Sequence, residues 1–319
     1  HLFARRQRQM CIRDRQAALD IFGWGEPLAP NTGRGISMYE RGPIGGDSSC
    51  RLTLHQSGTV TIEVPIADPG QGAYTAIQQI AAEALGTDTS DIAIKAAPTS
   101  DLPFDIGVSG SRVTFALGVT VTDAIEQLQS KMKELAGDAS FKRAAAELLR
   151  DEGQDVVINA YRQIPIFPAP PSTEFTAQIA EVEVDPETGN VLVKRLVTAH
   201  DIGTIVNPVG HQGQIEGGAI QGFGFGMMSE HLLDGGKPLA LSLADYKIPN
   251  IQDIPELETV LVQRADGPGP FNAGAIAESS NVPTASAIAN AVSDAIGQPI
   301  YEIPLSAERI YSLIQGTQP

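Results

Sequence analysis

Apolar and polar residues alternate along the chain with two different periods. In "RLTLHQSGTVTIEVPI", residues 51–66, they alternate at every second position and break at Ser57-Gly58, which predicts a β-hairpin. In "AYTAIQQIAAEALG", residues 73–86, apolar residues recur three and four positions apart, which predicts a helix closed by Gly86. The polar turn "ADPGQG", residues 67–72, joins the two elements.

A similar order of elements recurs later in the chain. Residues 176–203 predict a longer hairpin that turns at Asp185–Gly189, and a glycine-rich helical stretch follows at residues 207–228. This loose internal echo predicts two comparable units. The other predicted elements are strands at residues 91–97 and 257–263, and helices near residues 119–136, 139–150, 284–296 and from Ser306 onward.

The mixture of hairpins and helices favours an α+β fold over a doubly wound parallel sheet. A length of 319 residues suggests about two domains. We expect two hairpin-plus-helix halves, over residues 16–153 and 154–319. They divide near Gly153, where a helical pattern gives way to the proline-rich "PIFPAPPS".

The first residues do not resemble the rest of the protein. "RRQRQMCIRDR", residues 5–15, resembles a translated reading frame of a sequencing adapter, so residues 1–15 are treated as a non-native leader. The alternative is a genuine basic arm. With an adapter fused to Gln16, we expect the native start to be missing and the chain to be a carboxy-terminal fragment.

Charge and cysteine content narrow the function classes. The net charge is -16, and the excluded stretch alone holds five arginines, so the remaining chain is more acidic still. Such a field repels nucleic acid, and that class is excluded. Outside the leader Cys50 is the only cysteine, so no internal disulfide is expected. No apolar run is long enough to suggest a membrane span.

Two short loops have the composition of anion sites. In "DPGQG", Gly70 and Gly72 permit close backbone approach, and Gln71 adds an amide that both donates and accepts hydrogen bonds. A tight turn that needs glycine explains the same pattern equally well. "VSGSR", residues 108–112, is interpreted first as a solvated turn, and its hydroxyls and arginine offer a phosphate-holding loop as the alternative.

Polar residues inside the glycine-rich helix need an explanation. The glycines between Gly210 and Gly226 each disfavour a helix by about 1 kcal/mol, so they indicate close packing or a ligand against the backbone. Gln214 and Glu216 cannot both face a core without partners. For His200 and Asp201 a structural role is favoured over a metal or acid–base pair, because their spacing matches no strong metal motif.

Glu278 is the single charge in "FNAGAIAESSNVPTASAIANAV", residues 271–292. It is either an ordinary acid before a helix or a carboxylate in a dry pocket. Burial in such a pocket would raise its pKa and suit it to act as a base near neutral pH. Ser279 and Ser280 beside it lack a G-x-S-x-G elbow, so a hydrolase is disfavoured.

The ordered segments together resemble the xanthine dehydrogenase and aldehyde oxidase family, in the carboxy-terminal half of a bacterial molybdopterin-binding large subunit. The resemblance runs from about Gln16 to the end. It is carried by "GQGAYTAIQQIAAEALG", "GSR", "AHDIGTIVNPVGHQGQIEGGAIQGFGFG", "ADYKIPNIQDIPELETVLV" and "AESSNVPTASAIANAVSDAIG" followed by "IPLSAERI".

The resemblance implies a role for each matching residue. Glu278 matches the general base beside the molybdenum, in an oxidative hydroxylation of an aldehyde or nitrogen heterocycle with water as the oxygen source. The positions that match cofactor contacts are Gly70, Gln71, Gly72, Gly110, Ser111, Gln214 and Ala277. No side chain is expected to ligate the metal.

The resemblance also implies cofactors and partners. These are a molybdenum–molybdopterin cofactor, in bacteria the cytosine dinucleotide form, and FAD and [2Fe-2S] clusters on an FAD subunit and an iron–sulfur subunit, in a dimer of heterotrimers. The fragment alone is expected to be inactive. The cytoplasm is the favoured compartment and the periplasm the alternative, and the substrate stays open.

One departure from the family pattern bears on function. The family usually has Gly-x-Gly-Glu where this chain has Ala275-Ile276-Ala277-Glu278. If Ala277 needed a positive φ, it would be strained. The alternative function is therefore a non-catalytic scaffold or assembly subunit related to the same family. An unrelated acidic α+β module that binds a sugar or a partner protein is a further alternative.

Overall fold

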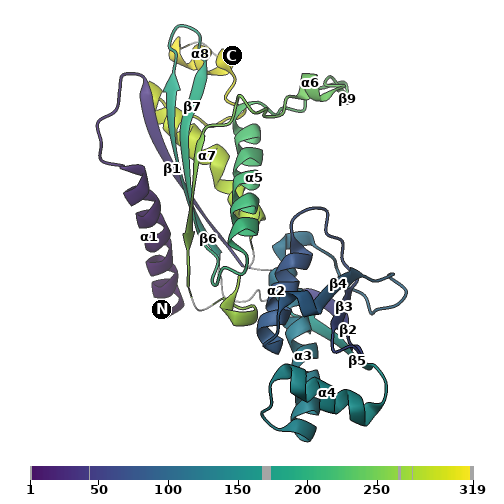
Figure 1. Cartoon of the computed structure of the whole chain (residues 1–319). Coiled ribbons are helices and arrows are strands. Elements are labelled where there is room, and N and C mark those ends of the chain that lie inside the picture. The colour runs from purple at the N-terminus through teal and green to yellow at the C-terminus, as the bar shows by residue number, and fades with distance from the viewer. Residues whose placement is uncertain (1, 43, 167–173, 265–266, 275, 317–319) are drawn as a thin grey trace.

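The chain folds into two lobes joined side by side (Figure 1). The computed structural model describes residues 2–42, 44–166, 174–264, 267–274 and 276–316, with side chains from residue 12 onward. Each lobe is built on one mixed four-stranded sheet with helices packed against it. The α+β fold expected from the sequence is confirmed.

The first lobe contains the hairpin and helix that the sequence predicts. Strand β2 pairs antiparallel with β3, and α2 then carries the chain to β4, which runs parallel to β3. The sheet order is β4-β3-β2-β5, and the elements are β2 (Gly46–Leu54), β3 (Val60–Val64), α2 (Ala73–Leu85), β4 (Ile92–Ala96) and β5 (Val156–Ile164). Gly86 ends α2 in the left-handed conformation, as predicted.

Three helices cover this sheet and form the larger apolar core. Helix α2 packs on α3 (Gly118–Ala136), and α4 (Phe141–Glu152) packs on α3. The apolar face of each helix follows from its sequence period, with Ile77, Leu128 and Leu148 almost fully buried. A π-helical turn, Val113–Leu117, leads directly into α3.

The second lobe repeats the strand arrangement of the first. Strand β6 pairs antiparallel with β7, and α5 then crosses to β10, which is parallel to β7. The sheet order is β10-β7-β6-β1, the counterpart of β4-β3-β2-β5, with β1 (Thr32–Arg41), β6 (Glu174–Val184), β7 (Val191–Asp201), α5 (Pro208–Met227) and β10 (Glu256–Val262). Both sheets are therefore a hairpin extended by a crossover on one side and an antiparallel strand on the other.

The expected division at Gly153 does not coincide with the sheets. Gly153 only ends α4, in a left-handed conformation. Strand β5 lies beyond Gly153 but pairs with β2, whereas β1 lies in the predicted first half but pairs with β6. Strand pairing is a long-range property that local composition does not reveal, so each lobe combines strands from both predicted halves.

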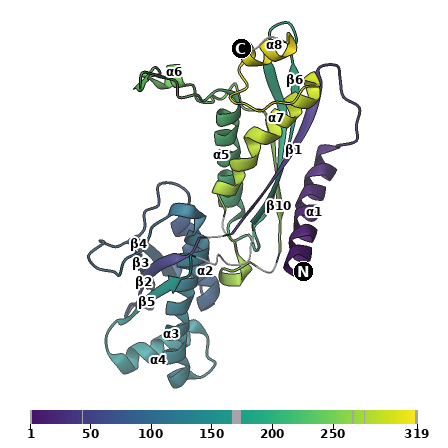
Figure 2. The same ribbon diagram turned by 180° about the vertical axis from the view of Figure 1, so that it is seen from behind.

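Helices cover both faces of the second sheet (Figure 2). Helix α7 (Val282–Ile296) packs on β1 and β6 from one side, and α1 (Leu2–Phe22) packs on β6 and β7 from the other. A last helix, α8 (Ala307–Ile314), begins at the N-cap Ser306. Across the two lobes, the bounds of five helices match the pattern of apolar residues to within two positions: those of α2, α3, α4, α5 and α7.

Helix α1 includes the adapter-like residues. Its Asp14 has both carboxylate oxygens buried without a hydrogen-bond partner among the described residues. Burial, followed by repulsion from Asp201, raises the pKa of Asp14 to about 8. An unpaired buried acid is a poor contact for an evolved interface. That residues 1–15 are a non-native leader stays a prediction, and the buried carboxylate of Asp14 supports it.

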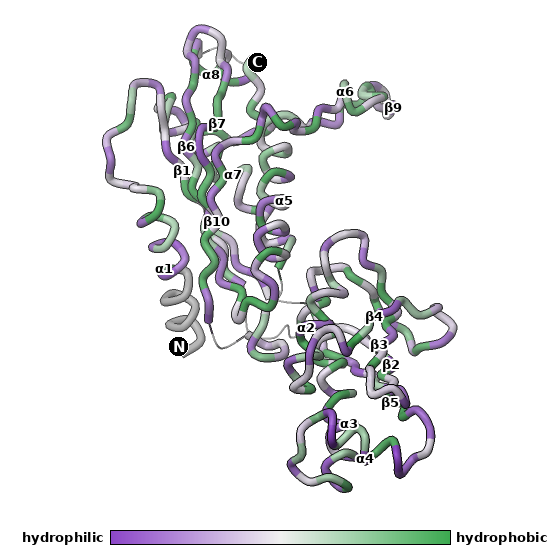
Figure 3. Tube along the Cα trace, in the orientation of Figure 1, coloured by the Kyte–Doolittle hydropathy of each residue, from purple (hydrophilic) through white to green (hydrophobic). Residues whose placement is uncertain are grey.

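A thin extension leaves the second lobe between α5 and β10. It holds β8 (Leu233–Asp234), β9 (Lys237–Pro238) and α6 (Leu243–Tyr246), and Figure 3 shows hydrophobic positions along it. Leu241 and Ile251 are more than four-fifths exposed there.

Among the described helices, none is both long and apolar enough to cross a membrane.

Glycines let α5 approach α7 and the turn before it. A Cβ at Gly218 would lie 1.8 Å from Ser280 Oγ, and a Cβ at Gly222 would lie 2.3 Å from the carbonyl oxygen of Asn281. By contrast, a Cβ at Gly213 would meet nothing within 4 Å. Close packing therefore accounts for the glycines on one side of α5.

We expect Gly222→Ala to lower the free energy of unfolding by about 1–3 kcal/mol, because the added methyl group would overlap a backbone carbonyl. Gly213→Ala, on the same helix, should raise it by up to about 1 kcal/mol through helix propensity alone. Urea unfolding of the two variants measures both effects. Equal effects of the same sign would contradict the packing described for α5.

Candidate active site at the junction of the lobes

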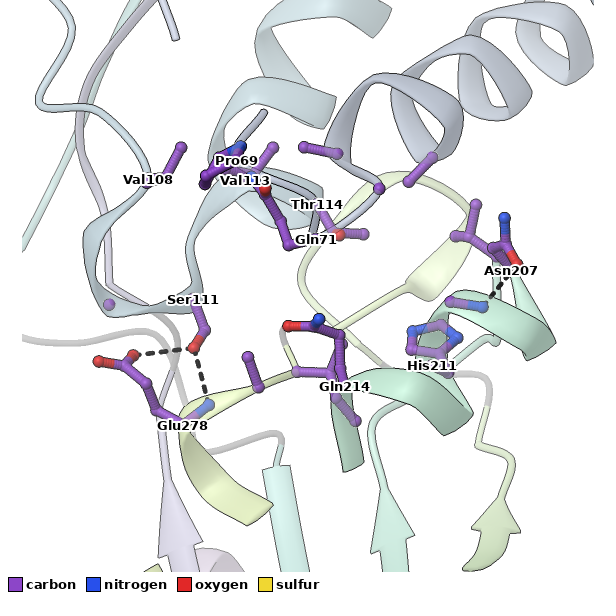
Figure 4. Close-up of a pocket in the computed structure, with 18 of the residues that line it drawn as sticks. Pro69, Gln71, Val108, Ser111, Val113, Thr114, Asn207, His211, Gln214 and Glu278 are labelled. Carbon is purple, nitrogen blue, oxygen red and sulfur yellow. Dashed lines mark hydrogen bonds between the residues drawn. The ribbon is translucent and has the colours of Figure 1, made fainter. Parts of the chain in front are cut away.

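A cavity of about 320 Å³ lies where the two lobes meet (Figure 4). The first lobe contributes the start of α2 and the loop before α3, and the second contributes the start of α5 and the turn before α7. The lining residues are Pro69, Gln71–Ala73, Ala76, Val108–Ser111, Val113, Thr114, Val206, Asn207, Gly210, His211, Gln214 and Ile276–Glu278. The two equivalent strand-to-helix crossovers therefore face each other across this cavity.

The cavity brings together seven of the eight residues that the sequence singled out. Gln71 and Gln214 reach into it from opposite walls, and Ser111 lies beside Glu278 (Figure 4). Gly72, Gly110 and Ala277 also line it. Gly70 does not line the cavity, and its role stays a prediction. Residues more than 200 positions apart thus share one site.

The helix start at the GQG turn is already occupied by a carboxylate of the chain. Asp68 accepts hydrogen bonds from the amides of Gly70, Gly72 and Tyr74 at 3.0–3.2 Å. Partial burial opposes the charge of Asp68, but its backbone amide donors outweigh that effect and hold its pKa below the usual range. These three amides are therefore already paired with a carboxylate of the chain, which agrees with the tight-turn alternative. Positive φ angles at Gly70 and Gly72 explain the glycines.

Arg112 is not available to a phosphate either. Its side chain is fully buried and forms an ion pair with Asp105 at 2.9 Å. All five of its N–H groups have acceptors, namely that carboxylate and the carbonyl oxygens of Gly45, Gly46, Asp47 and Gly107. The arginine therefore ties two loops together and is itself neither solvated nor free for a phosphate.

Glu278 lies at the edge of the cavity and is held from both lobes. Its Oε2 accepts hydrogen bonds from Ser111 Oγ at 2.8 Å and from the Arg41 guanidinium at 2.5 Å, while its amide donates to Ser111 Oγ at 3.1 Å. The side chain is 50% exposed. The dry surroundings expected from its small neighbours are therefore absent in the described chain.

Ala277 has the conformation that makes the departure from Gly-x-Gly-Glu costly. Its φ is 131° and its ψ is -68°, a region that glycine tolerates and alanine does not. Ser111, which bonds to the next residue, also has a positive φ of 56°. Ala275 lies outside the described residues. Strained backbone therefore flanks the Ser111–Glu278 contact on both sides.

A buried polar network supports this turn from below. Gln178, fully buried on β6, donates to the carbonyl oxygen of Ser280 at 2.6 Å and accepts from Thr284 Oγ1 at 2.6 Å. Ser280 Oγ in turn donates to the carbonyl oxygen of Ala277. Gln178, Ser280 and Thr284 are thus paired with one another and with the backbone of the turn, so the second sheet determines the position of the Glu278 turn.

His200 and Asp201 lie inside the second lobe and do not line the cavity. The two ring nitrogens of His200 contact Thr176 Oγ1 at 3.1 Å and Thr198 Oγ1 at 2.6 Å. Asp201 pairs with Arg264 at 3.3 Å. Burial, and then the neighbouring His211, lowers the pKa of His200 to about 3. Both residues are structural, as the sequence favoured.

The sequence did not single out Asn207 and His211 as site residues. Asn207 caps α5 by accepting from the amide of Gly210 at 2.9 Å, and His211 lies one turn into the helix. Two buried atoms at the cavity wall, Gln71 Oε1 and His211 Nδ1, have no hydrogen-bond partner among the described residues. No local pattern could have singled out these two residues, because the walls of the cavity come together only when the two lobes are assembled.

Ala277→Gly should stabilise the chain. Relief of a strained φ is worth about 1–3 kcal/mol, and the added freedom of glycine in the unfolded state offsets about 0.5–1 kcal/mol. The exposed helical Ala146 serves as the control, because Ala146→Gly should destabilise by about 1 kcal/mol. Denaturant midpoints check both signs, and a loss of stability in Ala277→Gly would contradict the strain.

His200→Gln should reduce the acid sensitivity of folding. The folded-state pKa of His200 lies far below the ordinary value of about 6.5. Below pH about 6.5 the unfolded chain therefore binds a proton at this residue that the folded chain does not bind. Stability is therefore greatest above pH about 6.5 and falls as the pH is lowered towards 3. Between pH 8 and pH 5 the variant should lose about 2 kcal/mol less than the wild type.

Urea unfolding across this pH range provides the measurement. The glutamine amide can still bond to both threonines, so the comparison isolates the proton. Parallel pH profiles for the two proteins would contradict neutral burial of His200.

Known proteins are similar to this chain in sequence and in fold. The family model of the molybdopterin cofactor-binding domain matches residues 16–255. The xanthine dehydrogenase molybdenum-binding subunit of Escherichia coli O157:H7 is 27% identical over 300 residues, covering 84% of this chain and 40% of that protein.

Two solved structures align along nearly the whole chain. The aldehyde oxidoreductase of Desulfovibrio gigas superimposes with a TM-score of 0.79 and 26% identity, over 96% of this chain and 35% of its own. The quinoline 2-oxidoreductase of Pseudomonas putida 86 shares the fold with a TM-score of 0.82 and 23% identity, over 100% and 45%.

The chain therefore spans about two-fifths of the length of these relatives. The family match begins at residue 16, directly after the adapter-like segment. With three-quarters of its residues inside one family model and the two-lobed fold in common with solved members, the chain belongs to the molybdopterin cofactor-binding domain family of the xanthine dehydrogenase and aldehyde oxidoreductase large subunits.

Proposed function

We propose that the chain is the cofactor-binding and catalytic part of a molybdenum hydroxylase large subunit. The reaction is the oxidative hydroxylation of an aldehyde or a nitrogen heterocycle, with water as the oxygen source. The observation that carries the proposal is one cavity lined by Gln71, Gln214 and Glu278, three residues of distant segments. When bound, the molybdenum cofactor supplies the redox chemistry of this reaction.

The residues of the cavity fit a pterin. A pterin is a flat heterocycle with donors and acceptors at its edge, and the cavity offers apolar walls with a few convergent polar groups. The buried Oε1 of Gln71 has no hydrogen-bond partner among the described residues, and a donor on the pterin edge can supply one. In contrast, Arg112 and the amides at the GQG turn are already satisfied by the chain, so this wall offers no obvious phosphate site.

Each residue has a distinct task in this proposal. Gln71 and Gln214 hold the pterin by hydrogen bonds from opposite walls, while Gly72 and Gly110 allow it to approach the backbone. Ser111 orients Glu278 by bonding to both its carboxylate and its amide. Because Oε2 already accepts two hydrogen bonds, Oε1 is the atom that receives the proton during the reaction.

The half-exposed position of Glu278 indicates that the working site has another wall. A general base works best where bulk water is excluded. Since the relatives are more than twice as long, we assign this wall to the remaining part of the large subunit. The cofactor takes the cytosine dinucleotide form, and an iron–sulfur subunit with [2Fe-2S] clusters and an FAD subunit carry the electrons away, in a dimer of heterotrimers.

Glu278→Gln tests the base role in the complete large subunit, expressed with its partner subunits. Turnover should fall by about 10²–10⁴-fold, because glutamine cannot accept the proton, while the molybdenum and pterin content should stay unchanged. Glu216→Gln, a carboxylate on α5 outside the cavity lining, is the matched control and should keep full turnover. Near-complete turnover in Glu278→Gln with bound cofactor would refute the base role.

A non-catalytic scaffold of the same family is the second candidate. The strained Ala277 and the ion pair between Arg41 and Glu278 favour it, because both depart from an open, relaxed site. The two candidates differ in metal content. A complete complex that assembles but never carries molybdenum or pterin would support the scaffold and exclude the hydroxylase.

A further inference from the structure

We propose that His211 is a cofactor-contacting residue, whose imidazole hydrogen-bonds to the polar edge of the pterin in the cavity between the lobes. The inference rests on the proposed function and extends the site by a residue that neither the sequence motifs nor the family resemblance assigned. It is carried by an unpartnered polar group that is built into the cavity wall.

The position of His211 on α5 directs it to the cavity. Asn207 and Gln214 lie on the same side of the helix, three to four residues away, and all three line the cavity (Figure 4). His211 as a whole is only 6% exposed. Its backbone amide is satisfied by the carbonyl oxygen of Asn207 at 2.9 Å, so the ring is the part left for a ligand.

The ring lacks the partners that a buried histidine normally has. Nδ1 is sealed from solvent and has no hydrogen-bond partner within the described parts of the chain. His200, in the same lobe, shows the usual arrangement, with a threonine on each ring nitrogen. An unmet buried nitrogen costs free energy, so the ring is held less firmly by the chain than a fully paired histidine. A ligand in the cavity contacts the ring through the small part of it that lines the cavity.

The chemistry of the wall selects the neutral, heteroaromatic part of the cofactor. Burial lowers the pKa of His211 to about 4, so the ring is uncharged at neutral pH, with one nitrogen donating and the other accepting. The other polar side chains at the helix starts, Gln71, Asn207 and Gln214, are amides. A set of neutral donors and acceptors matches an amide-like ring edge and attracts a phosphate poorly.

Chemical footprinting of the complete enzyme reports on the contact without activity. Diethylpyrocarbonate modifies accessible, neutral imidazoles, and mass spectrometry locates the modified residues. His231 should react in both the loaded and the cofactor-free complex, since its side chain is exposed. His200 should react in neither, because it is fully buried. His211 should react only when the pterin is absent.

The variant His211→Phe keeps the ring volume and removes both nitrogens. The rate at which the purified complex releases its pterin should rise about tenfold, the effect of one lost buried hydrogen bond. Gln212→Ala, next to His211 but outside the cavity lining, should release it at the wild-type rate. Thermal unfolding of the cofactor-free proteins separates this effect from a loss of folding.

The outcomes separate this inference from the proposed function. A loaded complex in which His211 reacts as fast as in the empty one, or from which His211→Phe releases pterin at the wild-type rate, overturns the contact and leaves the hydroxylase intact. A wild-type complex that contains no pterin overturns both. Protection of His211 by the bound pterin, together with faster release in His211→Phe, supports the contact.

Discussion

The site depends on a reciprocal contact between Ser111 and Glu278. The hydroxyl of one lobe donates to the carboxylate of the other and accepts from its amide, so two segments 167 positions apart are held in register. Both sides of this contact have unfavourable backbone, with positive φ at Ser111 and at Ala277. Strain of this kind persists only where the surroundings determine the geometry, and here the Gln178 network and the glycine face of α5 do so.

The two lobes meet through equivalent parts. Each sheet has a hairpin followed by a crossover helix and a parallel strand, and the helix starts of the two crossovers form opposite walls of the cavity. Ligands of α/β units commonly bind where strands lead into helices, because backbone groups and short side chains converge there. The repeated strand order therefore explains why the site lies between the lobes and not within either.

Local patterns predicted most elements but not their assembly. The hairpins at β2–β3 and β6–β7 and helices α2, α5 and α7 followed from periodicity and turn residues. The exchange of β1 and β5 between lobes did not, because strand pairing across more than 100 residues leaves no local signal. For the site, motif order identified seven residues that share the cavity, whereas His211 and the exposure of Glu278 depend on packing that a linear motif does not encode.

Arg112 shows what such a motif hides. Its position in a loop with serines and a glycine suggested a residue that binds anions. In the structure, Asp105 balances its positive charge, and its guanidinium also donates hydrogen bonds to four carbonyl oxygens. Lysine at this position would keep the charge but has only three donors for five acceptors. At least two of these acceptors would then lose their arginine donor in a dry interior. What this position requires is therefore the number and direction of its donors, and an exchange that looks conservative on paper would loosen the loop that carries Ser111.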